Sequence, residues 1–447
     1  MEYLESRLMF GMVPGLESTH ALCDALGNPE KKFRSIHVVG TNGKGSTSFY
    51  LAGILKAHGL KTGLFVSPHL VNLRERIRID DVPIPSTVLD RLLLQVKAAA
   101  QSVSRARVAT GGAALEPTFF EVLTLVAFLY YAECGIDVAV LEAGMGGRLD
   151  STAVAGGEIA VVTSIGLEHT EVLGSTESAI LREKMGVVGD SHERAAAKRF
   201  ILGGLSDALL EEARKYAAQL GCECVVPEIR EDIRLPNLGH HYIENASLSL
   251  AAAELFIKEM RLVNGATCAD YNDSLACIVL RSRSWAGRMQ ALAGPDGHAR
   301  IILDGAHNSH AVRRLVETLS KYYPDQKFHC LFGALKDKDV GEMLRLMAPH
   351  VSHWHITKTP YPRFRELSDL RGEMESLGLP VTSEGELSRG YLDQVLRGCC
   401  SDIRNNGMPL LVTGSLYMLG ACIELLKNDY AELAFFRGLE PTTNEHR

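Results

Sequence analysis

The sequence contains no apolar run long enough to cross a membrane. The longest candidate, residues 122–132, ends at Glu133 and is far shorter than the ~20 residues that a spanning helix needs. The N-terminal residues, Met1 to Glu5, are acidic and lack the basic and apolar regions of a secretory signal. These absences predict a cytoplasmic protein that does not bind a membrane.

Paired cysteines and an excess of positive charge are also missing. The ten cysteines are scattered, and the closest pairs, Cys222/Cys224 and Cys399/Cys400, lack zinc-ligand spacing, which favours reduced structural thiols. Lysine and arginine total 47 against 54 aspartates and glutamates, which gives a formal net charge of −7. This charge argues against a nucleic-acid partner that is bound through bulk charge.

The chain, at 447 residues, is too long for one typical hydrophobic core, so we expect more than one domain. Apolar strand-like runs alternate with segments of helical periodicity, which is typical of a doubly wound α/β protein. The runs are continuous, as in strands of a parallel sheet that are buried on both faces. The predicted strands are residues 36–39, 63–66, 138–141, 159–165, 299–303, 328–332 and 410–413.

A turn-rich segment, residues 292–297, separates two series of strands and helices. We therefore predict one domain in residues 1–292 and a smaller one in residues 293–447. Residues 98–116 are small, polar and rich in glycine, and they are predicted to form a surface loop.

A glycine-rich loop follows the first strand-like run. In such a loop the backbone N–H groups and the start of the next helix face an anion, and a lysine adds a point charge. Gly40 lies too close to Gly43 for the standard P-loop pattern, and Gly45 separates Lys44 from Ser46. An ordinary glycine-rich turn is the alternative, but the lysine and hydroxyls favour a shortened phosphate loop. The predicted loop comprises Gly40, Thr41, Asn42, Gly43, Lys44, Gly45, Ser46 and Thr47.

Polar side chains follow other strand-like runs. Ser67, Glu142 and His169 lie at or shortly after the carboxyl ends of predicted strands, where α/β sheets bind ligands. Each has a simpler interpretation alone, since a histidine after a strand is more often a hydrogen-bonded scaffold and Glu142 can cap a turn. Their joint position around one phosphate loop favours a site for a hard divalent cation.

The second half carries a similar set of polar residues after strand-like runs. Asp304 can hold a ribose hydroxyl, His307 a phosphate or carboxylate, and Arg288 can reach phosphates. A glycine turn capped by Asp304 explains this segment equally well. Ser415 follows the last predicted strand. Lys184, by its sequence context alone, is expected to be a solvated helical lysine.

Together these segments resemble the folylpolyglutamate synthase/dihydrofolate synthase family of Mur-type ligases. The resemblance covers nearly the whole chain, and the segments occur in the family's order. The matching segments are residues 40–47, 67–70, 117–121, 141–150, 163–170, 182–184, 287–288, 303–308, 332–339 and 414–415.

The resemblance implies a P-loop NTPase-like doubly wound N-terminal domain that binds ATP, a smaller Rossmann-like C-terminal glutamate-ligase domain, and a site in the cleft between them. It implies ATP, Mg²⁺ at two sites and often K⁺. The γ-carboxylate of a folate attacks the γ-phosphate of ATP, and the amine of L-glutamate then displaces phosphate from the acyl phosphate. The expected partners are therefore ATP, L-glutamate and a folate or dihydropteroate, and we expect a monomer.

The matched positions imply a role for each candidate residue. Lys44, Lys184 and His307 are the implied catalytic residues. The implied nucleotide-binding set adds Asn245, Arg288 and Asp304 to the residues of the phosphate loop. The implied Mg²⁺ ligands are Ser67, Glu142, His169 and Lys184. Lys184 matches a lysine that is carbamylated in the family and supports a second Mg²⁺, which replaces the solvated interpretation.

The implied substrate-binding residues are Phe120, Asp150, Ser151, His307 and Ser415. Phe120 matches an aromatic residue that stacks on the pterin of dihydropteroate, and Asp150 is retained. Ser151, Thr152 and Ala153 stand where the family usually has Ala-Thr-Asn. Polyglutamylation alone, another Mur-type acid–amino-acid ligase, and a P-loop protein that hydrolyses ATP without ligation are the alternatives.

Overall fold

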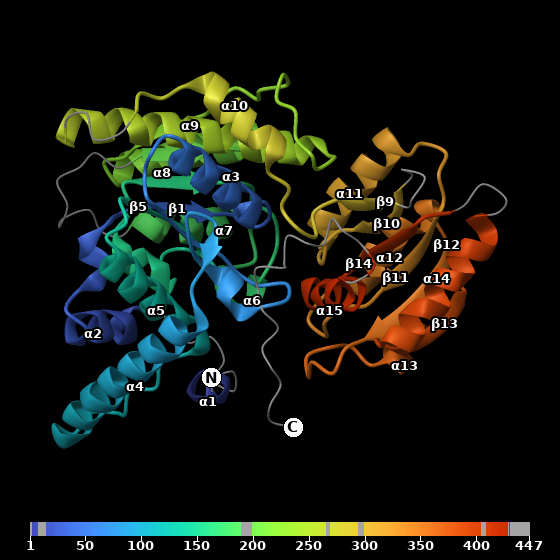
Figure 1. Cartoon of the computed structure of the whole chain (residues 1–447), viewed down its shortest axis with the longest axis horizontal. Helices are drawn as coiled ribbons and strands as arrows, with labels where there is room; N and C mark the ends of the chain where they lie inside the picture. Colours follow the sequence, from blue (N-terminus) through green and yellow to red (C-terminus); the bar gives the residue numbers. More distant parts are fainter. Residues whose placement is uncertain are drawn as a thin grey trace. The chain divides into compact units, whose positions relative to one another are not determined.

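The chain forms two compact α/β units, each with its own sheet (Figure 1). The computed structural model describes residues 2–7, 15–188, 199–264, 269–293, 299–403, 408–427 and 429. The first unit consists of residues 1–67, 74–235 and 242–283, and the second of residues 68–73, 236–241 and 284–447. The fold class therefore agrees with the prediction.

The point at which the second unit begins differs from the expected position. Residue 292 lies inside strand β9 (Gln290–Ala293), which pairs with β10 (Ala299–Leu303) in the second sheet. The second unit consequently begins earlier, at Ser284. Two short segments, residues 68–73 and 236–241, also belong to it, and nothing in their composition signals this.

The sheet of the first unit has the strand order β4-β3-β2-β5-β1-β6-β7-β8. Its neighbours are parallel from β2 to β8, whereas β3 pairs antiparallel with β2 and β4. The carboxyl ends of β2, β5, β1 and β6 therefore lie side by side, and the segments that follow them meet at one edge. The strands are β1 (Arg34–Val39), β2 (Thr62–Phe65), β3 (Ile77–Ile79), β4 (Val82–Pro83), β5 (Val138–Glu142), β6 (Ile159–Val162), β7 (Arg199–Leu202) and β8 (Glu223–Val225).

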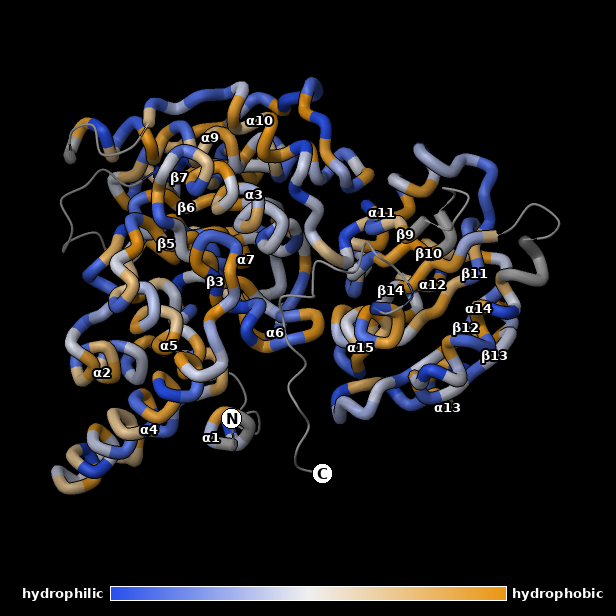
Figure 2. Tube along the Cα trace, viewed as in Figure 1, coloured by the Kyte–Doolittle hydropathy of each residue, from blue (hydrophilic) through white to orange (hydrophobic). Residues whose placement is uncertain are grey.

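Helices cover this sheet, and apolar residues gather along its strands (Figure 2). β5 is buried along its whole length, as its continuous apolar sequence predicts. The helices are α1 (Glu2–Ser6), α2 (Glu17–Ala25), α3 (Lys44–Ala57), α4 (Ser86–Ala109), α5 (Phe119–Cys134), α6 (Thr170–Leu173), α7 (Glu177–Met185), α8 (Asp207–Gln219), α9 (His240–Asn264) and α10 (Asp273–Ser282).

The predicted surface loop at residues 98–116 is wrong over its first part, because α4 continues to Ala109. Leu89, Leu93, Val96 and Ala100 are buried at helical spacing on the face of α4 that packs on α5. Most small residues of residues 98–109 are alanines, which favour a helix as strongly as any residue. Only residues 110–116 lie outside the helix.

The sheet of the second unit has the strand order β13-β12-β11-β14-β10-β9, with only the β9–β10 pair antiparallel. Its other strands are β11 (Phe328–Phe332), β12 (Val351–Lys358), β13 (Val381–Glu386) and β14 (Leu410–Thr413). Its helices are α11 (Ser309–Tyr322), α12 (Val340–Met347), α13 (Leu367–Ser376), α14 (Arg389–Ile403) and α15 (Leu416–Leu426). In neither unit does the described part of the chain contain a helix long and apolar enough to span a bilayer.

Candidate functional site

The glycine loop connects β1 to α3, as the sequence predicts. Gly43 precedes the first residue of α3 and has a φ of 90°, a conformation that glycine adopts without strain. A Cβ atom at this position would lie 2.5 Å from Oδ1 of Asn245, so only glycine allows this approach. The predicted nucleotide residue Asn245, on α9, is thereby placed against the phosphate loop.

Two lysines converge on one carbonyl oxygen of this loop. The Nζ atom of Lys44 donates to the oxygens of Gly40 (2.9 Å) and Thr41 (3.0 Å), and Nζ of Lys184 donates to Gly40 at 2.8 Å. Lys184 is only 4% exposed, so the solvated interpretation is wrong. Burial, followed by the charge of Lys44, lowers the pKa of Lys184 to about 7. A substantial fraction of this amine is therefore uncharged at neutral pH.

The candidate metal ligands follow neighbouring strands of the first sheet. The N–H of Ser67, after β2, donates to Oε2 of Glu142, at the end of β5, at 2.9 Å. His169 precedes α6 with a φ of 51°, which is uncommon for a residue other than glycine. Hydrogen bonds hold the loop that leads to His169 against the phosphate loop. The hydroxyl of Thr41 donates to the carbonyl of Gly166 and accepts from the N–H of Gly166, both at 3.0 Å.

This donor set fits a magnesium ion that is held partly by nucleotide oxygens. The described residues contain no group of three or more His, Cys, Asp or Glu arranged to hold a metal. A hydroxyl, a carboxylate and an imidazole leave coordination positions for phosphate oxygens and water. Mg²⁺ is commonly bound in this way, through one or two carboxylates together with substrate phosphates.

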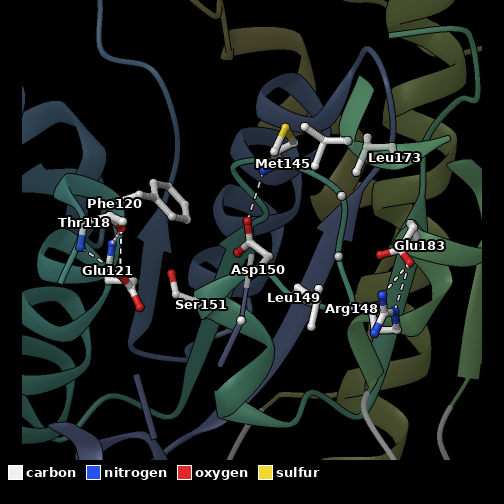
Figure 3. Close-up of a pocket in the computed structure, with 14 residues that line it drawn as sticks. Thr118, Phe120, Glu121, Met145, Arg148, Leu149, Asp150, Ser151, Leu173 and Glu183 are labelled. Atoms are coloured by element: carbon white, nitrogen blue, oxygen red, sulfur yellow. Dashed lines mark hydrogen bonds and ion pairs between the residues drawn. The ribbon is translucent and has the colours of Figure 1, made fainter. Parts of the chain in front are cut away.

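A pocket of about 100 Å³ in the first unit contains the predicted pterin-binding residues (Figure 3). Phe120, Asp150 and Ser151 all line it. Its floor includes the start of α5, where Thr118 and Glu121 form a reciprocal capping box. The remaining lining residues are Gly15, Met145, Gly146, Gly147, Arg148, Leu149, Val172, Leu173 and Glu183.

Both carboxylate oxygens of Asp150 accept hydrogen bonds from residues near the pocket wall. Oδ2 accepts hydrogen bonds from the N–H groups of Gly144 (2.8 Å) and Met145 (3.0 Å). Oδ1 accepts from the N–H (3.0 Å) and the hydroxyl (2.6 Å) of Thr152. Burial raises the pKa of this carboxyl, and the four hydrogen bonds oppose that rise.

Phe120 and Ser151 are also held by neighbours. The ring of Phe120 lies 5.5 Å from that of Phe65, centroid to centroid. A Cβ atom at Gly144 would lie 2.7 Å from Cζ of Phe120, so the absence of a side chain there lets the ring approach the backbone. The hydroxyl of Ser151 lies 2.8 Å from Oγ1 of Thr124. The serine at position 151 is therefore accommodated by a hydrogen bond.

The pocket is connected to the two lysines through α7. The N–H of Arg148 donates to the carbonyl of Glu183 at 2.8 Å, and the guanidinium donates to its Oε1 at 2.7 and 3.0 Å (Figure 3). Lys184, which contacts the phosphate loop, is the next residue. Two consecutive residues of α7 thus contact the pocket wall and the phosphate loop.

The candidate residues of the second unit gather after β10 and β14, which are paired and parallel. The N–H of Gly414 donates to the carbonyl of Ala306 at 2.9 Å and holds the two loops together. The buried carboxylate of Asp304 accepts from the N–H groups of Met289 and Ala306, both at 2.9 Å. Asp304 therefore caps this turn, which was one of its two predicted roles.

Arg288, His307 and Ser415 lie in the same cluster. The guanidinium of Arg288 packs closely on Gly305, since a Cβ atom added at Gly305 would lie 2.7 Å from Nη1 of Arg288. Nδ1 of His307 lies 2.8 Å from the carbonyl oxygen of Gly305, which fixes the ring with Nδ1 as the donor. Ser415 precedes α15, and its buried hydroxyl has no hydrogen-bond partner among the described residues. An unpaired buried hydroxyl at a helix start is suited to a ligand.

Sequence reasoning assigned no role to Gly144 or Glu183, although both lie in the matching segments 141–150 and 182–184, and it missed Thr124. Their partners lie far away in the chain or on another element, so no local pattern signals them. The capping box that begins α5 was readable, because Thr118 and Glu121 have the required spacing just before an apolar run.

Comparison with known proteins identifies the family. Residues 287–415 match the family model of the Mur ligase glutamate ligase domain. Over 446 residues the chain is 31% identical to the dihydrofolate synthase/folylpolyglutamate synthase of Bacillus subtilis, covering 95% of this chain and 98% of that protein.

Solved structures agree with this relationship. The folylpolyglutamate synthase of Mycobacterium tuberculosis, complexed with ADP and AMPPCP, superposes with a TM-score of 0.82 at 26% identity, over 95% of this chain and 96% of that one. The bifunctional folylpolyglutamate synthase/dihydrofolate synthase of Yersinia pestis, complexed with AMPPNP and a Mn ion, gives a TM-score of 0.75 at 26% identity, over 95% and 96%. The chain belongs to the folylpolyglutamate synthase/dihydrofolate synthase family of Mur-type ligases.

Proposed function

We propose that this chain is an ATP-dependent ligase that adds L-glutamate to folates, and also to dihydropteroate to form dihydrofolate. The relatives that carry both activities support the assignment. The observation that carries the second activity is the pocket, because Phe120 and Asp150 line the same cavity. A flat pterin suits a space with an aromatic ring and polar groups on its wall.

The reaction joins two anions, so positive charge must gather where they meet. The carboxylate of the acceptor attacks the γ-phosphate of ATP, which forms an acyl phosphate and releases ADP. The amine of L-glutamate then attacks the acyl carbon, forms the amide and releases phosphate. Lys44 and the N–H groups of the loop are proposed to stabilise charge on the transferred phosphoryl group.

Ser67, Glu142 and His169 are the residues proposed to hold Mg²⁺. When bound, this ion supplies positive charge that neutralises the triphosphate. Asn245 is proposed to contact the nucleotide from α9, because its side chain already lies against Gly43. Whether K⁺ also contributes is tested by replacing KCl with NaCl in the assay.

Lys184 is proposed to carry a carbamate that supports a second Mg²⁺. A neutral amine attacks CO₂, forms an N–C bond and loses one proton, which leaves a carboxylate at the end of the side chain. The lowered pKa of Lys184 supplies the neutral amine at physiological pH. Its contact with Gly40 places the modified group beside the phosphate loop.

The second unit is proposed to supply the groups that bind the incoming L-glutamate, together with further nucleotide contacts. His307 and Ser415 are assigned to L-glutamate, and the unpartnered hydroxyl of Ser415 supports this role. Arg288 and Asp304 are assigned to the nucleotide.

The decisive experiment measures phosphate release from Mg-ATP and L-glutamate, with dihydropteroate and with tetrahydrofolate in parallel. Turnover with both acceptors is the expected result. Turnover with tetrahydrofolate alone would restrict the enzyme to polyglutamylation and leave Phe120 and Asp150 as scaffold. A folded, ATP-binding protein that is silent with both would refute the folate assignment and favour another Mur-type acceptor.

A further inference from the structure

A second cavity of the first unit, here called the basic cavity, has a volume of about 650 Å³. It is lined by α1, by one face of α4 and by residues 115–117. Three of its side chains are cations, namely Arg7, Lys97 and Arg105, and Glu116 is its one carboxylate. The chain as a whole has a net charge of −7, so this concentration of positive charge is local.

Two of these cations have no carboxylate to balance them. Arg7 forms an ion pair with Glu116 and lies over the ring of Tyr3, 5.1 Å from its centroid. The ammonium of Lys97 lies 5.6 Å from the same centroid, and no ion pair involves Lys97 or Arg105 within the described ranges. A cavity with two uncompensated cations and an aromatic wall is suited to an organic anion.

The basic cavity adjoins, along the chain, the pocket proposed above to bind a pterin, here called the pterin pocket. Residues 115–117 line the basic cavity, and Thr118, Phe120 and Glu121 line the pterin pocket. The opposite wall of the pterin pocket leads through Glu183 to Lys184 and the phosphate loop. The residues that line the pterin pocket thus lie between the segment that lines the basic cavity and the contacts that lead to the phosphate loop.

This order matters for a substrate that becomes longer in every cycle, an argument that rests on the function proposed above. The reacting γ-carboxylate must stay at the phosphate loop, so the remainder of the molecule extends further away with each added glutamate. Each addition also leaves one α-carboxylate without a counter-charge. Cations beyond the pterin pocket are the groups that such a chain requires.

We infer that the basic cavity binds folates that already carry several γ-linked glutamates, with Lys97 and Arg105 pairing with their α-carboxylates. Tyr3 offers its ring to the aromatic end of the same molecule. A folate with one glutamate fills the pterin pocket and does not extend into the basic cavity. The cavity therefore determines affinity for long substrates and has no part in the chemical step.

The test compares tetrahydrofolate that carries one glutamate with its pentaglutamyl form. In the double variant Lys97→Gln/Arg105→Gln we expect KM for the pentaglutamyl substrate to rise about 5–10-fold, the effect of losing two partly exposed charge pairs. Its kcat, and both constants for the monoglutamyl substrate, stay unchanged. Added KCl shrinks the difference between wild type and variant, because salt screens exposed charges.

Arg107→Gln is the matched control, since it removes the same charge from α4 at a position that does not line the cavity. It is expected to leave KM for both substrates unchanged. Glu116→Gln gives the opposite perturbation, because it removes the one carboxylate of the cavity and should lower KM for the pentaglutamyl substrate.

Two results would overturn the inference: a double variant with wild-type KM for the pentaglutamyl substrate, or one whose KM rises equally for both substrates. Binding of a γ-linked pentaglutamate peptide, measured by calorimetry, tests the cavity without turnover. If wild type binds this peptide and Lys97→Gln/Arg105→Gln does not, the inference holds even when no ligase activity is found. Failure of the proposed function is thus distinguished from failure of the cavity.

Discussion

Replacing Asp150 with asparagine tests how the pterin pocket is built. The carboxylate accepts four hydrogen bonds, whereas an amide oxygen accepts on one side only and its NH₂ group must face the other. The better orientation places the amide oxygen towards Gly144 and Met145. The hydroxyl of Thr152 then rotates to accept from the NH₂ group, and the N–H of Thr152 loses its acceptor.

One unpaired buried N–H group costs about 1–3 kcal/mol, and we expect Asp150→Asn to lower the free energy of unfolding by that amount. Asp150→Ala leaves all four donors unpaired and should cost more, about 3–5 kcal/mol. Both variants should raise KM for dihydropteroate, because the pocket wall loses its fixed shape. Binding of an ATP analogue should not change, since Asp150 contributes no hydrogen bond to the phosphate loop.

Urea denaturation followed by circular dichroism measures the stability, and phosphate release measures KM. Asp137→Asn is the control, because this exposed carboxylate accepts a hydrogen bond from the N–H of Lys61 at 2.7 Å and lies outside the pocket. It should change stability by less than about 0.5 kcal/mol. If Asp150→Asn is as stable as Asp137→Asn and binds dihydropteroate normally, the argument from the hydrogen-bond network is refuted.

Three further outcomes are expected. Lys44→Ala should reduce ligation by at least ~100-fold with an unchanged thermal transition, and a variant that ligates at the wild-type rate would exclude the phosphate-loop assignment. Lys184→Ala should lose activity that acetate or formate partly restores. The ¹³C signal of a carbamate formed from labelled CO₂ should be absent from that variant. In wild type this signal should be stronger at pH 8 than at pH 6, because the fraction of Lys184 that is neutral increases as pH rises through about 7. Burial raises the pKa of Asp81, but its bonds to Arg283 and Lys56 outweigh burial and lower that pKa to about 2. The ionised Asp81 should therefore add about 1–2 kcal/mol, after solvent screening, to the free energy of unfolding above pH ~4, and this contribution should be lost as pH falls towards 2. When the free energy of unfolding is measured against pH, wild type should lose this contribution over that range and Arg283→Gln should lose less.

The strands that were predicted are continuous apolar runs buried on both faces, but β7 and β12, which are also largely buried, were missed. Residues 299–303, 328–332 and 410–413 were predicted with the bounds that β10, β11 and β14 have. The edge strands β4 and β13 were missed because they are short or polar, and their pairing depends on neighbours in the sheet. The second half of α4, residues 98–109, was missed because its small residues were interpreted as a loop.

The placement of candidate residues could be predicted where they follow the carboxyl ends of strands. Glu142 and the glycine loop needed only the order of strand and polar residue. The environment of Lys184 could not be predicted, because its burial depends on a phosphate loop that lies far away in the sequence. Only the family resemblance indicated its importance, and the structure supplies a physical reason.

That reason is first the burial of Lys184 and then its distance from a second positive charge. The ammonium groups of Lys44 and Lys184 both lie within 2.9 Å of the oxygen of Gly40, so they can be no more than about 6 Å apart. Two unit charges at that distance repel each other by roughly 3 kcal/mol at an effective dielectric constant of about 20, which corresponds to about two pK units. In the proposed carbamate, a negative group would face Lys44 at a similar distance, so the repulsion would become an attraction of similar size. For the carbamate proposed above, Lys44 would therefore have two effects on its neighbour: it helps burial to keep the amine neutral, and it would stabilise the carboxylate that forms when the amine reacts with CO₂.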